Sequence, residues 1–153
     1  MARISTIELH IQTGDLSGAG TDGDIYLGLC GREFYIDSQH DDFERGASRT
    51  YVLGDGSNVL HPEFNDPREP VLFTEYASHF PAYIRFHPRS REDNWQLQRA
   101  DVRFNGSLHI DWDTVGLFVN APKLGIWLGV HAGLVAHLVN HSHGQPADAL
   151  LSI

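Results

Sequence analysis

Apolar and polar residues alternate with a period of two along much of this chain, and no other feature constrains the fold as strongly. Successive side chains of a β-strand point to opposite faces of a sheet, so this alternation predicts strands that bury one face. The strand-like runs lie at residues 7–12, 25–30, 34–37, 50–53, 71–73, 83–87, 101–104, 108–113, 125–128 and 134–139. No segment shows a convincing apolar period of 3.6 residues over three helical turns. We therefore predict an all-β fold, an antiparallel β-sandwich of about eight strands.

Turn signals separate the predicted strands. Asn105-Gly106 stands between two alternating runs, and because both residues accept positive φ the pair predicts a hairpin. Residues 54–81 are irregular and rich in proline, which cannot donate to a ladder, so we expect loops around one short edge strand. Residues 147–151 are expected to form one helical turn or a frayed tail. With no repeat or linker in sight, residues 1–153 are predicted to form a single domain.

The charge balance excludes some partners. The formal net charge is −9, from 11 Lys and Arg against 20 Asp and Glu. Nucleic acid is a poor partner for such a chain, because neutralising its phosphates needs clustered cations. No apolar run approaches the roughly 18 residues that a membrane span needs. The first residues show no signal-peptide pattern, and the single Cys30 excludes an internal disulfide and is expected to be a buried, inert thiol. These features lead us to expect a cytoplasmic location.

Two acidic loops that contain glycine flank one of the predicted strands. They span residues 18–24 and 37–46, and a third acidic patch lies at residues 92–94. Calcium prefers six to eight hard oxygen ligands, which carboxylates, carbonyls and water supply. Aspartates in such loops are also common turn residues, since their side chains bond to nearby backbone groups. The pattern is compatible with either a calcium site or simple turns.

Three short motifs follow one another in a fixed order. They are Ala19-Gly20-Thr21-Asp22, the Asp-Phe-x-x-Gly element at 42–46, and the Asp-x-Trp element at 93–95. In this combination, residues 5–113 resemble the PLAT, or lipoxygenase homology, domain. They are also similar to the C-terminal membrane-binding domain of clostridial phospholipase C toxins. Residues 114–153 have no clear counterpart and are expected to add C-terminal strands and a tail.

The resemblance implies an eight-stranded sandwich, similar to C2 domains, that binds lipid surfaces or proteins, sometimes through calcium. Carried over by position, it implies Ca²⁺ as the cofactor and these ligand candidates: the Gly20 carbonyl, Thr21, Asp22, Asp37, Asp41, Asp42, Asp93 and Asn94. Two departures stand out. Gln39-His40 replaces a turn of smaller residues, which puts a third calcium position in doubt, and the 54–81 insert is longer than in many relatives.

Several aromatic and histidine residues admit two interpretations. Trp95 and Phe43 could insert into lipid, but packing inside the sandwich is the favoured prediction, and Trp112 and Trp127 are expected in the core or half-core. Four histidines gather near the C-terminus and could bind Zn²⁺ or Ni²⁺. They are His131, His137, His141 and His143. Their spacing fits no structural zinc pattern, so an incidentally metal-binding tail is favoured.

The combined prediction is a non-catalytic, calcium-binding module that binds a membrane lipid surface or a protein partner. One alternative is a calcium-independent protein-interaction or homodimerisation module, whose surface would use the 54–81 insert and the apolar residues of 124–139. A carbohydrate-binding module is a second alternative. An enzyme is not expected, because the sequence shows no nucleophile elbow, no Ser/His/Asp order and no paired-carboxylate cleft.

Overall fold

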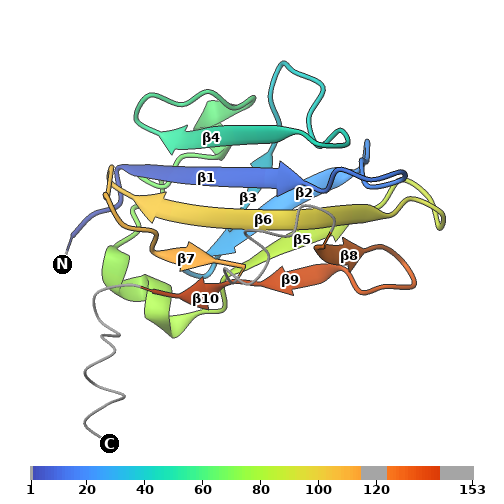
Figure 1. Ribbon diagram of the computed structural model, residues 1–153. Helices are drawn as coiled ribbons and strands as arrows, with labels where there is room; N and C mark the ends of the chain where they lie inside the picture. Colours follow the sequence, from blue (N-terminus) through green and yellow to red (C-terminus); the bar gives the residue numbers. More distant parts are fainter. Residues whose placement is uncertain (1, 115–123, 142–153) are drawn as a thin grey trace, which may run out of the picture.

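A computed structural model describes residues 2–114 and 124–141, which form ten strands and two 3₁₀-helices (Figure 1). The strands are β1 Thr6–Thr13, β2 Asp24–Leu29, β3 Arg32–Ile36, β4 Ser48–Gly54, β5 Tyr83–His87, β6 Trp95–Phe104, β7 Trp112–Asp113, β8 Ile126–Leu128, β9 Val135–His137 and β10 Val139–Asn140. The helices are η1 Pro62–Phe64 and η2 Thr74–His79. Among the described residues, no helix is both long and apolar enough to cross a membrane.

The strands form two antiparallel sheets that pack face to face. The first sheet has the order β10-β7-β6-β1-β4, with β8 paired to the early part of β6. The second sheet has the order β3-β2-β5-β9 and lies behind the first in Figure 1. Alternate residues of each sheet are buried between them; Ile7, Leu9, Ile25 and Leu27 have no exposed surface. The prediction of an all-β sandwich is confirmed.

The predicted strand at 108–113 is much shorter in the structure. Asn105 and Gly106 do form a tight turn with positive φ, closed by a 2.9 Å hydrogen bond from Ser107 N to Phe104 O. Strand pairing, however, resumes only at Val102 and Trp112. The Asp111 carboxylate accepts the Phe104 N–H at 2.9 Å, so a side chain replaces the neighbouring strand there. Residues 107–111 therefore leave the sheet.

The irregular region 54–81 also differs from the prediction. Residues 71–73 make only isolated bridges, and the region instead contains the two 3₁₀-helices. Backbone hydrogen bonds from Ile4 N to Leu72 O and from Thr74 N to Ala2 O fix this segment to the N-terminal residues. The predicted strand at 134–139 is split, because the Leu138 N–H bonds to Ala82 O and the chain then passes to the other sheet. Residues 147–151 lie outside the described residues.

Trp95 is the largest fully buried side chain and connects several elements. Its ring packs against Phe43, with centroids 5.6 Å apart, and against Phe86 at 5.8 Å. Its indole Nε1 donates a 2.9 Å hydrogen bond to Thr13 Oγ1 at the end of β1. The preference for packing over lipid insertion is therefore confirmed for Trp95 and for the buried Phe43.

The other two tryptophans differ from each other. Trp112 is buried, as expected, at the start of β7. Trp127 lies in the middle of β8 and keeps 38% of its surface exposed. The expected core or half-core position is therefore wrong for Trp127, because Ile126 and Leu128 face the core and strand alternation turns the residue between them outward.

Replacement of Thr13 by valine tests the buried indole hydrogen bond. Thr13→Val keeps the side-chain shape but leaves the Trp95 N–H without its acceptor, so the free energy of unfolding should fall by about 1–3 kcal/mol. Urea denaturation measures this loss. The control Thr50→Val removes a hydroxyl that bonds to His10 at the surface and should change the stability by less than about 0.5 kcal/mol. Equal losses in the two variants would contradict the role given to Trp95.

Candidate metal site at the loop end of the sandwich

Three loops meet at one end of the sandwich. We call residues 14–23 the first loop, residues 37–47 the second loop and residues 88–94 the third loop. Backbone hydrogen bonds join the first two, from Thr21 N to Phe43 O at 3.0 Å and from Gly46 N to Gly14 O at 3.0 Å. The third loop is held to the first by Arg89, whose Nε donates to the Asp22 carbonyl at 3.0 Å. The loops thus form one connected surface.

Gly20 explains how the first two loops come so close. A Cβ atom at this position would lie 2.7 Å from the Arg45 nitrogen and 3.2 Å from the Glu44 Cα, both backbone atoms that cannot move aside cheaply. Only glycine allows this approach. The Ala-Gly-Thr-Asp motif therefore has a steric reason: Ala19 is buried, Gly20 permits the contact, and the following aspartate is left at the surface.

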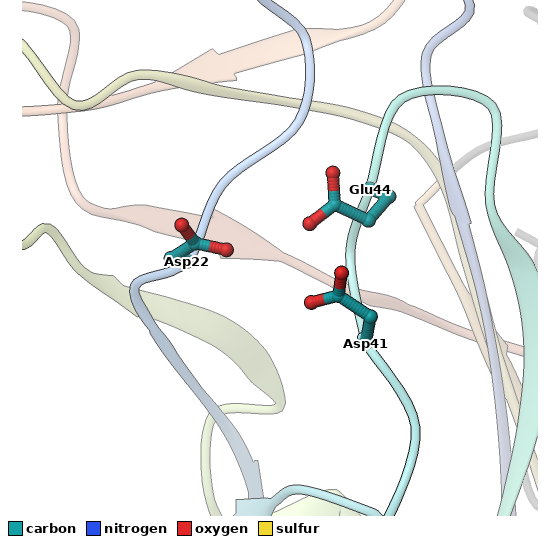
Figure 2. Close-up of side chains that lie close together, drawn as sticks. All are labelled: Asp22, Asp41 and Glu44. Atoms are coloured by element: carbon teal, nitrogen blue, oxygen red, sulfur yellow. The ribbon is translucent and has the colours of Figure 1, made fainter.

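Asp22, Asp41 and Glu44 form a carboxylate cluster between the first and second loops, and Figure 2 shows the three side chains turned toward one another. One oxygen from each lies within 4.8 Å of the others, and all three residues are exposed. Two oxygens bound to the same Ca²⁺ at 2.3–2.6 Å are at most about 5 Å apart. The donor set and its spacing therefore fit a calcium ion, with room for carbonyl and water ligands.

Three like charges lie close together at this cluster. Partial desolvation is the largest of the causes that raise the pKa of Glu44 above its usual value, and repulsion from Asp41 and Asp22 adds to it. Within the described residues no other group of three or more Asp, Glu, His or Cys side chains has such spacing. A bound cation would relieve the repulsion, because it offsets several carboxylates at once.

An open pocket of about 250 Å³ extends from this cluster. Asp22 and Asp41 line it together with Asp37, which is less exposed than they are, and with Arg89. Burial raises the pKa of Asp37, and the Asp42 carboxylate adds to the effect, while a hydrogen bond from the Ser38 N–H opposes it. Asp37 is thus placed beside the cluster but is not part of it.

Asp42 has a different environment from its neighbour Asp41. Its buried carboxylate accepts hydrogen bonds from Ser38 N at 2.9 Å and from Tyr51 Oη at 2.8 Å, and the Arg49 Nε lies 3.6 Å away. Burial and this hydrogen bond raise the pKa of Tyr51 well above its usual value. Asp42 therefore holds the second loop against β4, and its oxygens already have donors.

Thr21, Asp93 and Asn94 also make contacts within the loops. Thr21 Oγ1 donates to Asp93 Oδ1 at 2.6 Å, and Asp93 Oδ2 accepts the Arg89 N–H at 2.8 Å. The Asn94 amide donates to the Glu92 carbonyl at 3.3 Å. These residues connect the third loop to the first.

Of the eight ligand candidates from the sequence, the structure brings Asp22 and Asp41 into the cluster. Sequence reasoning missed Glu44. It joins the cluster through Phe43, whose burial with φ of 63° turns the chain so that Asp41 and Glu44 face the same side. A bulky residue with positive φ is rare, so a local sequence pattern does not reveal this turn.

A short apolar hairpin lies beside the third loop. Residues 129–134 connect β8 and β9, and Gly129 N bonds to Gly133 O at 2.9 Å. A Cβ atom on Gly129 would collide with the Asn94 side chain, which shows how closely the hairpin approaches the loop end. The side chains of Val130 and Leu134 are 45% and 43% exposed. An acidic cluster and an exposed apolar hairpin therefore share one end of the molecule.

The C-terminal histidines do not gather in the described part of the chain. His141 Nε2 lies 2.8 Å from Asp113 Oδ1 in the first sheet, while His137 pairs with Tyr83 in the second. His131 is exposed in the hairpin, and His143 lies outside the described residues. Cys30 is buried, and burial raises the pKa of its thiol to about 11, in agreement with the expected inert thiol.

Comparison with solved structures places the fold in a known class. The alpha toxin of Clostridium absonum matches with a TM-score of 0.60 and 20% identity, over 90% of this chain and 32% of the toxin. The alpha toxin of Clostridium perfringens avian strain SWCP matches with a TM-score of 0.55 and 18% identity, over 88% of this chain and 31% of the toxin. A coral 8R-lipoxygenase, with calcium activation via a C2-like domain, matches at 0.54 and 16%, over 88% of this chain and 17% of the enzyme. The fold is therefore the C2-like sandwich shared by these proteins.

Sequence comparison points to the same class. Lipoxygenase homology domain-containing protein 1 of Homo sapiens is 34% identical over 58 residues, and its counterpart in Mus musculus matches equally. The match covers 35% of this chain and only 3% of the length of either relative. No family model matches the chain. The resemblance to the PLAT, or lipoxygenase homology, domain is thereby confirmed.

Two neighbouring aspartates should respond differently to the same substitution. Asp42→Asn places an amide N–H opposite donors from Ser38 or Tyr51, so the free energy of unfolding should fall by about 1–3 kcal/mol. Asp41→Asn should not lower the stability, because Asp41 is exposed and repels Glu44. Urea denaturation of the two variants measures the difference in their free energies of unfolding. A destabilisation of similar size in both would show that Asp42 has no special bracing role.

Proposed function

We propose that this chain is a non-catalytic module that binds a lipid surface through its loop end in a calcium-dependent way. The observation that carries the proposal is the carboxylate cluster of Asp22, Asp41 and Glu44 next to the exposed apolar hairpin 129–134. Each part alone is common in proteins. Together they supply a cation site and a surface that enters the edge of a bilayer.

The physical argument depends on charge. In the absence of calcium, an acidic loop end on a chain of net charge −9 is repelled by an anionic bilayer. Calcium bound by the three carboxylates offsets this charge and orders the first and second loops. Three protein carboxylates leave coordination positions open, since Ca²⁺ takes six to eight oxygens, and lipid phosphate oxygens fit those positions. The ion then bridges the protein and the membrane.

The comparisons with known proteins support the proposed class of function but do not identify a binding partner. A coral 8R-lipoxygenase is activated by calcium via a C2-like domain, and this chain shares that fold. The matched regions cover a third or less of each toxin or enzyme, so this chain corresponds to a domain and not to the whole of those proteins. A non-catalytic role agrees with this, because the cluster lies in an open, exposed pocket and not in an enclosed one.

Calcium should bind at this cluster and stabilise the fold. Calorimetric titration of chelator-treated protein should show saturable binding, and Ca²⁺ at a hundred times its dissociation constant should raise the free energy of unfolding by about 2.7 kcal/mol. Mg²⁺ should bind more weakly, because it requires stricter octahedral geometry. Glu44→Gln should abolish the calcium signal, whereas the matched control Glu63→Gln, on exposed η1, should retain it. No heat and no rise in melting temperature with calcium would refute the metal site.

The hairpin should contribute to membrane binding. In the presence of calcium, Val130→Ser should weaken co-sedimentation with vesicles of phosphatidylcholine and phosphatidylserine roughly fivefold, because a half-exposed apolar side chain no longer enters the bilayer. Leu108→Ser is the matched control; Leu108 is 89% exposed and follows the opposite end of β6. If the chain binds calcium but does not bind vesicles, a calcium-dependent protein partner becomes the better proposal.

A further inference from the structure

A second candidate site lies on the outer face of the four-stranded sheet. Ile25 and Leu27 of β2 point into the core, so Tyr26 and Gly28 point outward. Tyr26 pairs with Tyr35 of β3 on one side and with Arg85 of β5 on the other. The outer face therefore carries a row of aromatic and charged side chains that the proposed calcium function does not use.

Glu33 connects the polar groups of this face. Its carboxylate accepts hydrogen bonds from Tyr83 Oη at 2.7 Å and from Arg85 Nε and Nη2 at 2.8 and 3.0 Å. The hydrogen bond from Arg85 is the main reason that the pKa of Glu33 lies below its usual value. The Arg85 guanidinium also stacks over the Tyr26 ring, 4.0 Å from its centroid. Acceptors and donors are thus held in fixed positions next to aromatic rings.

A pocket of about 320 Å³ opens between this face and helix η1. Tyr26, Tyr35 and Glu33 form its floor, and His61 and Phe64 form its wall. Phe64 is 73% exposed, so its ring is accessible to a ligand in the pocket. The pocket has the volume and the mixed lining of small-ligand sites.

The wall of the pocket is held rigidly. Asn65 is buried; its Oδ1 accepts the Tyr35 N–H at 2.7 Å, and its Nδ2 donates to the His61 carbonyl at 3.1 Å. Arg32 Nη2 donates to the Phe64 carbonyl at 3.1 Å. His61 has a φ of 52°, a left-handed conformation that costs free energy in a residue other than glycine. These contacts hold the backbone of η1 that carries the exposed Phe64.

The charges of the pocket indicate a neutral ligand. Glu33 and Arg85 form an ion pair and cancel each other, so the floor attracts neither sign strongly. Glu33 is the carboxylate among the residues that line the pocket, and because Arg85 pairs with it, neither a cationic nor an anionic ligand meets an unpaired opposite charge there. A pyranose ring suits this site, because its C–H face packs on aromatic rings and its hydroxyls both donate and accept hydrogen bonds.

We propose that this pocket, lined by Tyr26, Glu33, Tyr35, His61 and Phe64, binds a neutral carbohydrate independently of calcium. A second pocket of about 250 Å³ shares Glu33 and is bordered by Tyr83 and the 46% exposed Phe80. Because Glu33 lines both, the two pockets are adjacent and accommodate neighbouring units of an oligosaccharide. The ligand class is therefore a neutral oligosaccharide and not a single sugar.

The test is binding of the full chain to an array of neutral glucans, mannans, galactans and xylans, followed by calorimetry with the strongest of them. Saturable binding should be the same in chelator and in calcium. Phe64→Ala should weaken it roughly tenfold, since one stacking contact is lost, and Phe64→Trp should keep it. Leu108→Ala, which truncates another exposed side chain that lines neither pocket, is the matched control and should bind as the unaltered chain does.

Three results would overturn this proposal. They are no binding to any neutral glycan, equal binding by the chain and Phe64→Ala, or binding that the chelator abolishes. Sedimentation of the same variants tests whether this face is instead a contact between two copies of the chain. A dimer that Phe64→Ala dissociates would show that it is. Phe64→Ala should leave the calcium titration unchanged, so failure here is separable from failure of the calcium site.

Discussion

The burial of Trp95 between the two sheets is the interaction on which the rest of the structure depends. The indole lies at the start of β6, packs against Phe86 of β5, and bonds to Thr13 where β1 ends. It also packs against Phe43 of the second loop. One side chain therefore joins both sheets and fixes a loop at the end of the sandwich. This packing holds the second loop, which carries Asp41 and Glu44 of the carboxylate cluster.

This arrangement explains why adjacent acidic residues have different roles. Phe43 enters the core with a left-handed backbone, and Asp42 turns inward with it to accept hydrogen bonds from Ser38 and Tyr51. Asp41 and Glu44 on either side remain at the surface. A buried charge is costly unless hydrogen-bond donors surround it. The carboxylate that is buried here, that of Asp42, is accordingly the one with several donors. The exposed ones are free to bind a cation.

The loop end and the outer face of the second sheet serve different chemistry. At the loop end, like charges gather and an apolar hairpin stands beside them, which favours a cation and a lipid surface. On the outer face, Glu33 and Arg85 cancel each other beside aromatic rings, which favours a neutral ligand. The carboxylate cluster and the sugar pocket share no residue, although Tyr35 borders both the pocket beside the cluster and the sugar pocket.

The alternation of the sequence was enough to predict the sandwich, because each strand has one apolar face and no segment with a helical apolar period is present to cover it, which leaves a second sheet. The sequence also located the turn at Asn105-Gly106 and the three acidic loops. Tertiary structure decided where pairing resumes after that turn, since the Asp111 carboxylate occupies the Phe104 N–H. It likewise decided that Glu44, rather than Asp42, joins the cluster. Which carboxylate faces solvent depends on donors and packing supplied by residues far along the chain, and a local pattern does not record them.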